Sequence, residues 1–361
     1  MATNLLTIDC RESQVPVSQT SRGSLMWKDF GKNILVSLKK TRLQTEASRL
    51  NLNGEALDRE LSRRGFNLSR LHSAHDAHHR SLEIILSALR NRNLKYNVEN
   101  ARDLELEAMK GIDFVISVGG DGTFLETAHL IKTSEIPLLG INSDPACSVG
   151  KLCAAAIGKD DFDYVLSRIE HGFFSWHMRS RVGLILVKSN GETKHTHHYA
   201  VNEMLFAEKD VSRATMHQVK IDDQAFGPVQ KSCGVLVCSG SGSTAWIHSA
   251  SAIRVDDAEL VLKATGHPYA SQVAERIVNE INRDFILPPT SPDVLFFVRE
   301  SLSFAHHHQV PRRGLAKKVS VLSLGFNTCI FMDGLAKVEV DNGTMAVMSV
   351  DKEKSLRTFL F

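Results

Sequence analysis

The sequence predicts two joined domains: an N-terminal α/β domain with a mostly parallel sheet covered by helices on both faces, and a C-terminal β-rich, β-sandwich-like domain. The chain has 361 residues, which exceeds the usual length of one domain, and its 43% hydrophobic content is enough for sizeable cores. Strand and helix patterns alternate up to residue 147, as in parallel sheets with crossover helices. From residue 182 onward, β-rich runs follow one another with fewer helices between them.

The α/β domain is expected at residues 33–147, after a polar arm at residues 1–32. Short apolar runs rich in β-forming residues predict buried strands, and apolar residues at helical spacing, such as Leu82, Ile85 and Leu89, predict helices between them. The expected order is a strand at 33–38, a helix at 81–92, a strand at 95–98, a helix at 104–109, a strand at 114–118, a helix at 123–132 and a strand at 136–141.

The β-rich domain is expected at residues 148–335, and the segment 336–361 is a candidate to return to the N-terminal domain. A helical insertion at about 250–285 interrupts the strands, because four apolar residues from Val273 to Phe285 recur at four-residue spacing. We expect an exposed loop at 300–318. The expected strands are 182–187, 215–221, 235–238, 294–298 and 319–324.

Charge and composition exclude several classes of partner. The net charge of +2 is too small to indicate nucleic acid or an anionic membrane surface as the main partner. The longest apolar runs are far shorter than the roughly 20 residues that span a bilayer, so no membrane partner is expected. Six irregularly spaced cysteines indicate reduced thiols and a reducing interior compartment. Asp9 and Glu12 weaken the acid-poor pattern of a mitochondrial transit peptide, so composition leaves targeting open.

Three groups of histidines could be interpreted as metal ligands. None is paired with a cysteine or carboxylate at a recognised metal-binding spacing, so we expect solvated polar surface and no structural metal. The groups are His72, His75, His78 and His79; His195, His197 and His198; and residues 306–308.

The glycine turn Gly119-Gly120-Asp121-Gly122-Thr123 follows a predicted buried strand and begins a predicted helix. Open α/β sheets bind ligands at such junctions. Glycines let the backbone approach phosphate oxygens closely, and the helix N-terminus offers free N–H groups to an anion. The turn therefore predicts a phosphate site, although an Asp-Gly turn without chemistry is the plain alternative.

Asp121 is the candidate base within this turn. A carboxylate beside a phosphate repels it, so the residue makes sense as a base or through a metal. It can accept the proton of a hydroxyl as the oxygen attacks phosphorus. The chain has no Walker A pattern, so the site is not a P-loop.

Two polar motifs lie in the β-rich half. Asn202-Glu203 offers an amide to a base edge and a carboxylate to ribose hydroxyls, but alone it is indistinguishable from solvated loop residues. The run from Ser239 to Trp246 reads SGSGSTAW and directly follows a strand. Its small residues admit close backbone contact, and Trp246 can form an aromatic wall. A flexible Gly/Ser linker is the alternative for this run.

The glycine turn resembles the GGDGT signature shared by NAD kinases, lipid kinases of the diacylglycerol and sphingosine type and, more distantly, phosphofructokinases. The order GGDGT, then NE, then a GSTA-type run resembles the NAD kinase family over about residues 33–351. The likeness is greatest to the mitochondrial type found in animals. Its signs are the segment GINSDP at 140–145, Trp246 in place of the usual tyrosine, and the long helical insertion.

This resemblance implies transfer of the γ-phosphoryl group of ATP, with Mg²⁺, to the 2′-hydroxyl of the adenosine ribose of NAD. It implies that Asp121 is the catalytic base and that Gly119, Gly120, Gly122 and Thr123 line the ATP phosphates. The implied NAD-binding residues are Asn202, Glu203, Ser241, Thr244, Ala245, Trp246, Ser249 and Asp333. A homodimer and a mitochondrial location, otherwise a cytoplasmic one, are implied as well.

Two departures from the family pattern bear on the NAD site. Cys233 stands before Gly234, where most members have an aspartate, so the contact of that aspartate with NAD is in doubt. Gly240-Ser241 replaces the usual Pro-Thr, which should loosen the loop and alter how NAD is seated.

Other functions explain less of the sequence. Residues 240–245 fit a G-x-G-x-x-A dinucleotide fingerprint of an NAD-binding oxidoreductase, but Asp256 and Asp257 arrive too soon for its ribose-binding acid. A lipid kinase leaves Asn202-Glu203 and the serine run unexplained, and no clear membrane-docking surface is seen. Asp121 argues against a non-catalytic binding protein.

Overall fold

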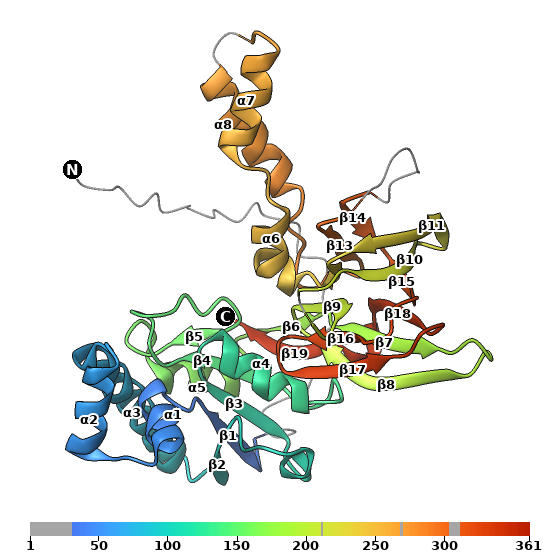
Figure 1. Ribbon diagram of the computed structural model, residues 1–361. Helices are drawn as coiled ribbons and strands as arrows, with labels where there is room; N and C mark the ends of the chain where they lie inside the picture. The colour runs from blue at the N-terminus through green and yellow to red at the C-terminus, as the bar shows by residue number, and fades with distance from the viewer. Residues whose placement is uncertain (1–30, 211, 268–269, 303–310) are drawn as a thin grey trace.

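The computed structural model describes residues 31–210, 212–267, 270–302 and 311–361. Over these residues the chain forms one seven-stranded sheet with flanking helices and two six-stranded antiparallel sheets (Figure 1). The fold class predicted from the sequence is confirmed, because the mixed parallel sheet lies in the N-terminal part and the antiparallel sheets lie in the C-terminal part. No helix among these residues is both long and apolar enough to cross a membrane.

The first sheet has the strand order β2-β1-β3-β4-β19-β6, with the short β5 paired to β4. Its strands β1 to β5 run parallel, and β19 is parallel to β4 but antiparallel to β6. The last strand of the chain therefore completes the first sheet. The bounds are β1 Ile34–Leu38, β2 Tyr96–Asn100, β3 Phe114–Gly119, β4 Leu138–Asn142, β5 Ala155–Ala156, β6 Ser175–Arg179 and β19 Leu356–Leu360.

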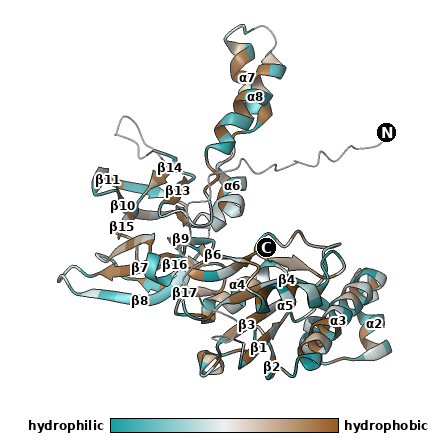
Figure 2. Cartoon of the chain, turned by 180° about the vertical axis from the view of Figure 1, so that it is seen from behind, coloured by the Kyte–Doolittle hydropathy of each residue, from teal (hydrophilic) through white to brown (hydrophobic). Residues whose placement is uncertain are grey.

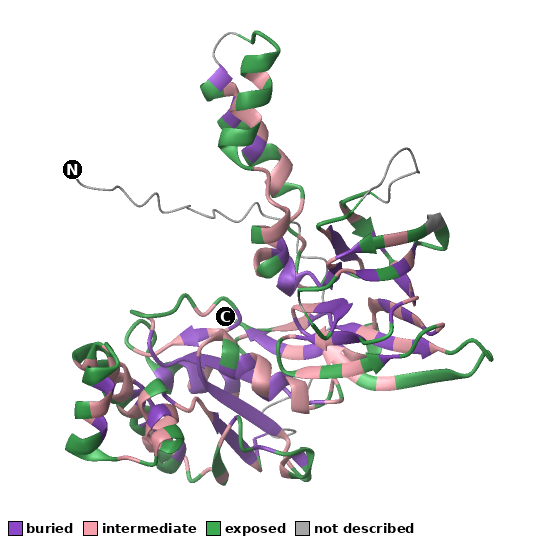
Figure 3. Cartoon of the chain, in the orientation of Figure 1, coloured by how far each residue is buried: buried purple, intermediate pink, exposed green. Residues whose placement is uncertain are grey.

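Helices pack on both faces of this sheet. One apolar cluster joins α3 (Leu68–Asn91) and α5 (Phe162–Glu170) to one face, and another joins α4 (Asp121–Leu130) and the short η2 (Leu106–Met109) to the other. Every residue of β3 and β4 is buried, which Figure 3 shows as continuous purple strands and Figure 2 as a largely hydrophobic centre. Burial on both faces explains why these strands are recognisable as unbroken apolar runs.

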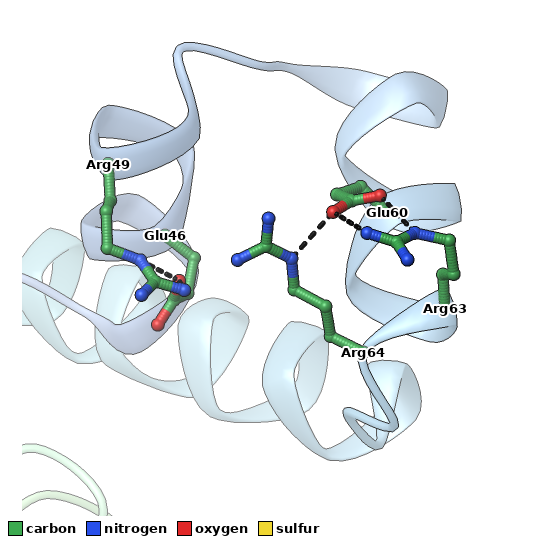
Figure 4. A network of polar contacts seen from close by, with 5 residues as sticks. All are labelled: Glu46, Arg49, Glu60, Arg63 and Arg64. Carbon is green, nitrogen blue, oxygen red and sulfur yellow. Dashed lines mark hydrogen bonds and ion pairs between the residues drawn. The ribbon is translucent and has the colours of Figure 1, made fainter.

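Two helices, α1 (Arg42–Leu50) and α2 (Gly54–Arg63), pack against α3 at the edge of this domain. Figure 4 shows their ion pairs. The buried Glu46 carboxylate lies 2.7 Å from the Arg49 guanidinium, and Glu60 lies 2.6 Å from Arg64. Hydrogen bonds from Arg63 and Arg64 lower the pKa of Glu60 to about 2. These pairs connect charged residues three or four positions apart and stabilise single helices.

The two antiparallel sheets share one apolar core and form a sandwich. Strand β7 alternates buried and half-buried residues, as expected when only one face of a sheet packs on a core. One sheet has the order β11 (Gln224–Ser232), β10 (Thr215–Ile221), β15 (Lys318–Ser323), β18 (Met345–Val350), β7 (Val182–Val187), β8 (Thr193–Ala200). The other has β14 (Arg313–Ala316), β13 (Val294–Arg299), β12 (Gly234–Cys238), β9 (Glu203–Glu208), β16 (Thr328–Met332), β17 (Ala336–Val340).

A helical hairpin projects from the sandwich (Figure 1). It consists of α7 (Val255–Ala264) and α8 (Ala270–Arg283), and it follows the short α6 (Trp246–Ser251). The buried residues of α8 are Ala270, Ala274 and Val278. The apolar stripe expected from Val273 to Phe285 is therefore shifted by one position, and Phe285 packs beyond the helix against the outer face of the second sandwich sheet.

Several local expectations differ from the structure. The second domain was expected to begin at residue 148. Instead, β5 and β6 belong to the first sheet, α5 packs on that sheet, and the sandwich begins at Val182. The helix expected from residue 81 begins at Leu68. The loop expected at 300–318 contains β14 and the start of β15, which pair with neighbouring strands, while its residues 303–310 lie outside the described part of the chain.

One histidine of the first group is also placed differently. His78 is buried, not solvated, and its Nδ1 lies 2.9 Å from the Ser143 hydroxyl. Burial lowers the pKa of His78 to about 4. In the residues that the structure describes, no group of three or more His, Cys, Asp or Glu side chains is arranged to hold a metal ion. Residues 306–308 are not among them.

Candidate active site

The glycine turn joins β3 to α4 at the carboxyl edge of the first sheet. Gly119 ends the strand, Gly120 caps the helix, and Asp121 is its first residue. A Cβ atom at Gly119 would lie 2.3 Å from the Thr123 hydroxyl oxygen, and one at Gly120 would lie 3.2 Å from that of Ser148. The turn is therefore as tight as the sequence predicts. Position 119 must be glycine, because a side chain there would collide with Thr123 of the following helix.

A cavity of about 390 Å³ opens beside this turn. Three cationic residues, Lys39, Lys40 and Arg102, line it together with the turn, Glu126 and Ser148. A helix N-terminus surrounded by cations suits a group of phosphates. Sequence reasoning missed these cations, although they follow strands β1 and β2, whose carboxyl ends meet at the same edge of the sheet as β3.

The carboxylate of Asp121 contacts the loop between β4 and β5. Oδ1 accepts the backbone N–H of Leu152 at 2.8 Å, and Oδ2 accepts that of Lys151 at 3.1 Å. These bonds fix the position of the carboxylate beside the cavity. They also leave each oxygen a further lone pair that can accept a hydroxyl proton.

The Asn202-Glu203 motif forms a turn between β8 and β9 that Asp333 holds in place. Oδ1 of Asp333 accepts the backbone N–H groups of Asn202 and Glu203, both at 2.9 Å, and Oδ2 accepts that of Val201 at 2.7 Å. Asp333 follows β16, which pairs with β9, so this residue, expected at the NAD site, lies directly beside the motif.

The side chains of Asn202 and Glu203 are half-buried, and each has a buried oxygen that is not hydrogen-bonded. Oδ1 of Asn202 and Oε2 of Glu203 have no hydrogen-bond partner in the described residues. Burial raises the pKa of Glu203 to about 7, and the nearby charge of Asp333 adds to the effect. Burial also raises the pKa of Asp333 to about 6, against the lowering effect of its three backbone bonds. Buried polar atoms without a partner are uncommon in folded proteins, and here they indicate that a polar ligand binds.

The serine run packs directly on the Asn202-Glu203 turn. The backbone N–H of Ser239 donates to the carbonyl of Asn202 at 2.9 Å, and the Ser239 hydroxyl donates to the carbonyl of Val201. A Cβ atom at Gly242 would lie 2.2 Å from the Asn202 carbonyl oxygen, so the two backbones touch. The Asn202-Glu203 turn and the serine run, which lie far apart in the sequence, thus form one surface.

The expected looseness of Gly240-Ser241 is wrong. A Cβ atom at Gly240 would lie 1.8 Å from the carbonyl oxygen of Pro288, so glycine is required by close packing. Ser239, Ser241 and Ser243 are buried, and residues Ser241–Thr244 form a 3₁₀ turn. Cys233 stands just before β12, whereas the serine run follows the other end of that strand, so Cys233 does not join the cluster.

The remaining predicted residues lie at the rim of this surface. Thr244 and Ala245 are half-buried, Ser249 is exposed, and Trp246 is 42% exposed at the start of α6. The Arg299 guanidinium stacks 5.2 Å from the centre of the Trp246 ring. Trp246 is therefore placed to form an exposed wall beside the serine run.

Arg179 links the serine run to the glycine turn. Its Nη1 donates to the Ser241 hydroxyl at 3.2 Å, and its charge interacts with that of Asp121. Sequence reasoning missed this residue. An isolated arginine at the end of a strand carries no sequence signal of such a role.

Comparison with known sequences identifies the family. The sequence model of the ATP-NAD kinase N-terminal domain matches residues 43–171, which include the glycine turn. "NAD kinase 2, mitochondrial" from Homo sapiens is 29% identical, over 91% of this chain and 84% of the relative. "NADH kinase" from Arabidopsis thaliana is 28% identical, over 72% of each chain. These relatives give no support to the lipid kinase alternative.

Comparison with solved structures supports the fold. An NAD kinase from Archaeoglobus fulgidus in complex with ATP has a TM-score of 0.53 at 16% identity, over 91% of this chain and 93% of that chain. Yeast NADH kinase complexed with NADH has a TM-score of 0.56 at 15% identity, over 93% and 85%. These structures support the fold, and the matching N-terminal domain together with the relatives that align over 91% of this chain shows that the chain belongs to the NAD kinase family.

Proposed function

We propose that the protein transfers the γ-phosphoryl group of ATP to the 2′-hydroxyl of the adenosine ribose of NAD, giving NADP and ADP. The observation that carries this proposal is the juxtaposition of two sites. A cation-lined cavity lies at the glycine turn, and Arg179, which is within electrostatic range of Asp121, donates to Ser241 in the polar surface built from Asn202, Glu203 and the serine run. Family membership supports the choice of NAD as the acceptor.

The donor phosphates occupy the cavity at the glycine turn in this proposal. Gly120, Gly122 and Thr123, which line the cavity, and Gly119 just before them contact the phosphates, and Lys39, Lys40 and Arg102 neutralise their charge. Asp121 accepts the proton of the ribose hydroxyl as its oxygen attacks phosphorus. Phosphoryl transfer needs little covalent help, so positioning and charge stabilisation supply most of the rate.

The acceptor adenosine occupies the Asn202-Glu203 surface. The unpaired Asn202 Oδ1 accepts a hydrogen bond from the base, and Glu203 accepts one from a ribose hydroxyl. Ser241, Thr244, Ala245, Trp246 and Ser249 contact the rest of NAD. Asp333 holds the turn through three backbone N–H groups, and its Oδ2, which accepts only one of them, has a lone pair left for the direct contact with NAD that the resemblance implies.

Mg²⁺ belongs with the donor in this proposal. Mg²⁺ at kinase sites is held by one or two carboxylates together with substrate phosphates. The cavity offers the Glu126 carboxylate, which also pairs with Arg102 at 2.9 Å, and one carboxylate fits that donor set. Bound there, the ion neutralises charge on the β- and γ-phosphates.

We also propose a mitochondrial location and a homodimer. The mammalian relatives carry a mitochondrial name, which supports the location. Exposed apolar residues on the projecting hairpin, Leu260 and Val261, support self-association. Fractionation of cells and light scattering of the purified protein test these two points separately.

An acceptor panel tests the proposed function. Purified protein is incubated with ATP and Mg²⁺ and with NAD, NADH, diacylglycerol or sphingosine, and the phosphorylated product is identified by mass spectrometry. We expect NADP from NAD. Phosphorylation of a lipid without formation of NADP or NADPH would overturn the proposal.

A further inference from the structure

Arg179 occupies the point where the chain passes from the first sheet to the sandwich. It is the last residue of β6, and β7 begins three residues later at Val182. Its side chain is only 9% exposed. Nη1 donates to the Ser241 hydroxyl at 3.2 Å. A residue of the first sheet thus holds Ser241, which is the first residue of the 3₁₀ turn in the serine run.

The same guanidinium interacts with the glycine turn. Burial lowers the pKa of Arg179, and the charges of Asp121 and, to a lesser extent, Cys153 oppose that shift. Cys153 directly follows Leu152, whose N–H bonds to the Asp121 carboxylate. Arg179 therefore bonds to the serine run and lies within electrostatic range of the candidate base.

The cost of burying this cation is not fully offset within the protein. Nε of Arg179 is buried without a hydrogen-bond partner in the described residues. A buried charge with an unsatisfied donor destabilises a fold, and an apolar residue of similar size would serve packing alone better. The arrangement indicates a role beyond stability.

Arg181, two residues further on, provides a contrast. It is fully buried and its Nη2 also lacks a hydrogen-bond partner in the described residues, but its Nη1 donates to the carbonyl of Ile131 at 2.5 Å, its Nε donates to that of Lys354, and it stacks on the Tyr199 ring. These bonds connect Arg181 to the end of α4 and to the C-terminal segment. Its hydrogen bonds go to Ile131 and Lys354 and not to the serine run, so it serves as a control for burial of an arginine at the same junction.

We propose that Arg179 is a positioning residue that fixes Ser241 relative to Asp121, so that the ribose hydroxyl rather than water meets the donor phosphorus. This inference rests on the proposed function. In productive transfer, the bond between the γ-phosphorus and the bridging oxygen of ADP breaks, the ribose oxygen bonds to phosphorus, and its proton passes to Asp121. When the ribose is displaced, a water oxygen makes that bond instead, and the products are ADP, inorganic phosphate and a proton.

The test is the ratio of NADP formed to ADP formed under saturating ATP and NAD. Wild type should give a ratio near one. Arg179→Lys shortens the donor and Ser241→Ala removes its acceptor, and each should lower the ratio several-fold, since small displacements of a reacting group cost up to about a hundredfold in rate. The double variant should be no worse than the worse single variant, because both changes remove one contact.

Arg181→Lys is the matched control. It should lower the melting temperature and leave the ratio near one. An unchanged ratio in both Arg179→Lys and Ser241→Ala, or additive losses in the double variant, would overturn the positioning role. If Arg179→Lys does not fold, Ser241→Ala alone decides, since it removes only a hydroxyl. Absence of NADP from folded wild type would instead refute the proposed function, so the two failures are distinguishable.

Discussion

The Asp333 carboxylate accepts the backbone N–H of Asn202 at 2.9 Å. The same carboxylate accepts the N–H groups of both neighbours of Asn202, and the N–H of Asp333 donates back to the Glu203 carbonyl at 3.1 Å. Two segments about 130 residues apart are thereby fixed in one geometry. The shape of the proposed adenosine site therefore depends on the Asp333 carboxylate.

Asp333→Asn should destabilise the protein and weaken NAD binding. The amide retains one acceptor oxygen but presents an N–H group to one of the three backbone donors, so an unpaired buried donor results. This costs about 1–3 kcal/mol. We expect KM for NAD to rise more than KM for ATP. Asp351→Asn is the control, because that residue caps Glu353 at an exposed turn where asparagine caps equally well. Equal effects on the two KM values would contradict the positioning role.

Glu203→Gln should change the pH dependence of stability. The folded-state pKa of Glu203, about 7, lies above its ordinary value of 4.5. The stability contributed by its protonated form is fully present below 4.5 and is lost as the pH rises through 7. Glutamine has no proton to lose, so its contribution to stability does not change with pH. Between about pH 5 and pH 8, the free energy of unfolding of the variant should therefore rise relative to that of wild type by on the order of 2–3 kcal/mol.

Chemical denaturation of both proteins across this pH range measures the difference. A difference that stays constant with pH would show that Glu203 is ionised in the folded protein throughout. NADP formation by the variant should fall at every pH, because the acceptor oxygen for the ribose is replaced by an amide.

Gly242→Ala should disrupt the contact between the serine run and the Asn202-Glu203 turn. The added Cβ would lie 2.2 Å from the Asn202 carbonyl oxygen, so one backbone must move. We expect a loss of about 1–3 kcal/mol in stability and a higher KM for NAD. Gly183→Ala is the control, since its nearest neighbour would lie at 3.5 Å, an ordinary contact. Equal thermal stability of the two variants would contradict the packing described here.

Lys39→Gln should weaken donor binding. Lys39 lines the phosphate cavity, and loss of one charge-assisted bond of about 1.5 kcal/mol corresponds to a rise in KM for ATP of roughly tenfold. KM for NAD should change little. Lys188→Gln is the control, because Lys188 pairs with Glu192 at 3.0 Å on the sandwich. A selective rise in KM for NAD would place the acceptor, not the donor, in this cavity.

The strands that carry the site were predictable from the sequence, because burial on both faces leaves unbroken apolar runs such as β3 and β4. The glycine turn was predictable for a related reason. Close backbone contact at Gly119 excludes every side chain and leaves a visible run of glycines.

Other features depend on contacts that sequence does not display. The first half of α3 is polar, and its buried positions include His78 and Ser81, which bond to Ser143 after β4 rather than forming an apolar stripe. Lys39 reaches the cavity only because separate strands end at one edge of the sheet. Arg179 reaches the serine run only because the second domain packs beside the first. The change from sheet to sandwich was misplaced because β5 has only two residues and β6 has no unbroken apolar run, so neither is visible in the sequence as a strand of the first sheet.

The central claim is that Asp121 accepts the ribose proton during phosphoryl transfer to NAD. The most direct test compares Asp121→Asn with wild type by following NADP formation from ATP, Mg²⁺ and NAD with an NADP-specific dehydrogenase. We expect a fall of roughly 10²–10⁴-fold in kcat, with ATP binding retained. A folded variant that keeps the wild-type rate would contradict the role of Asp121 and leave the family assignment in place.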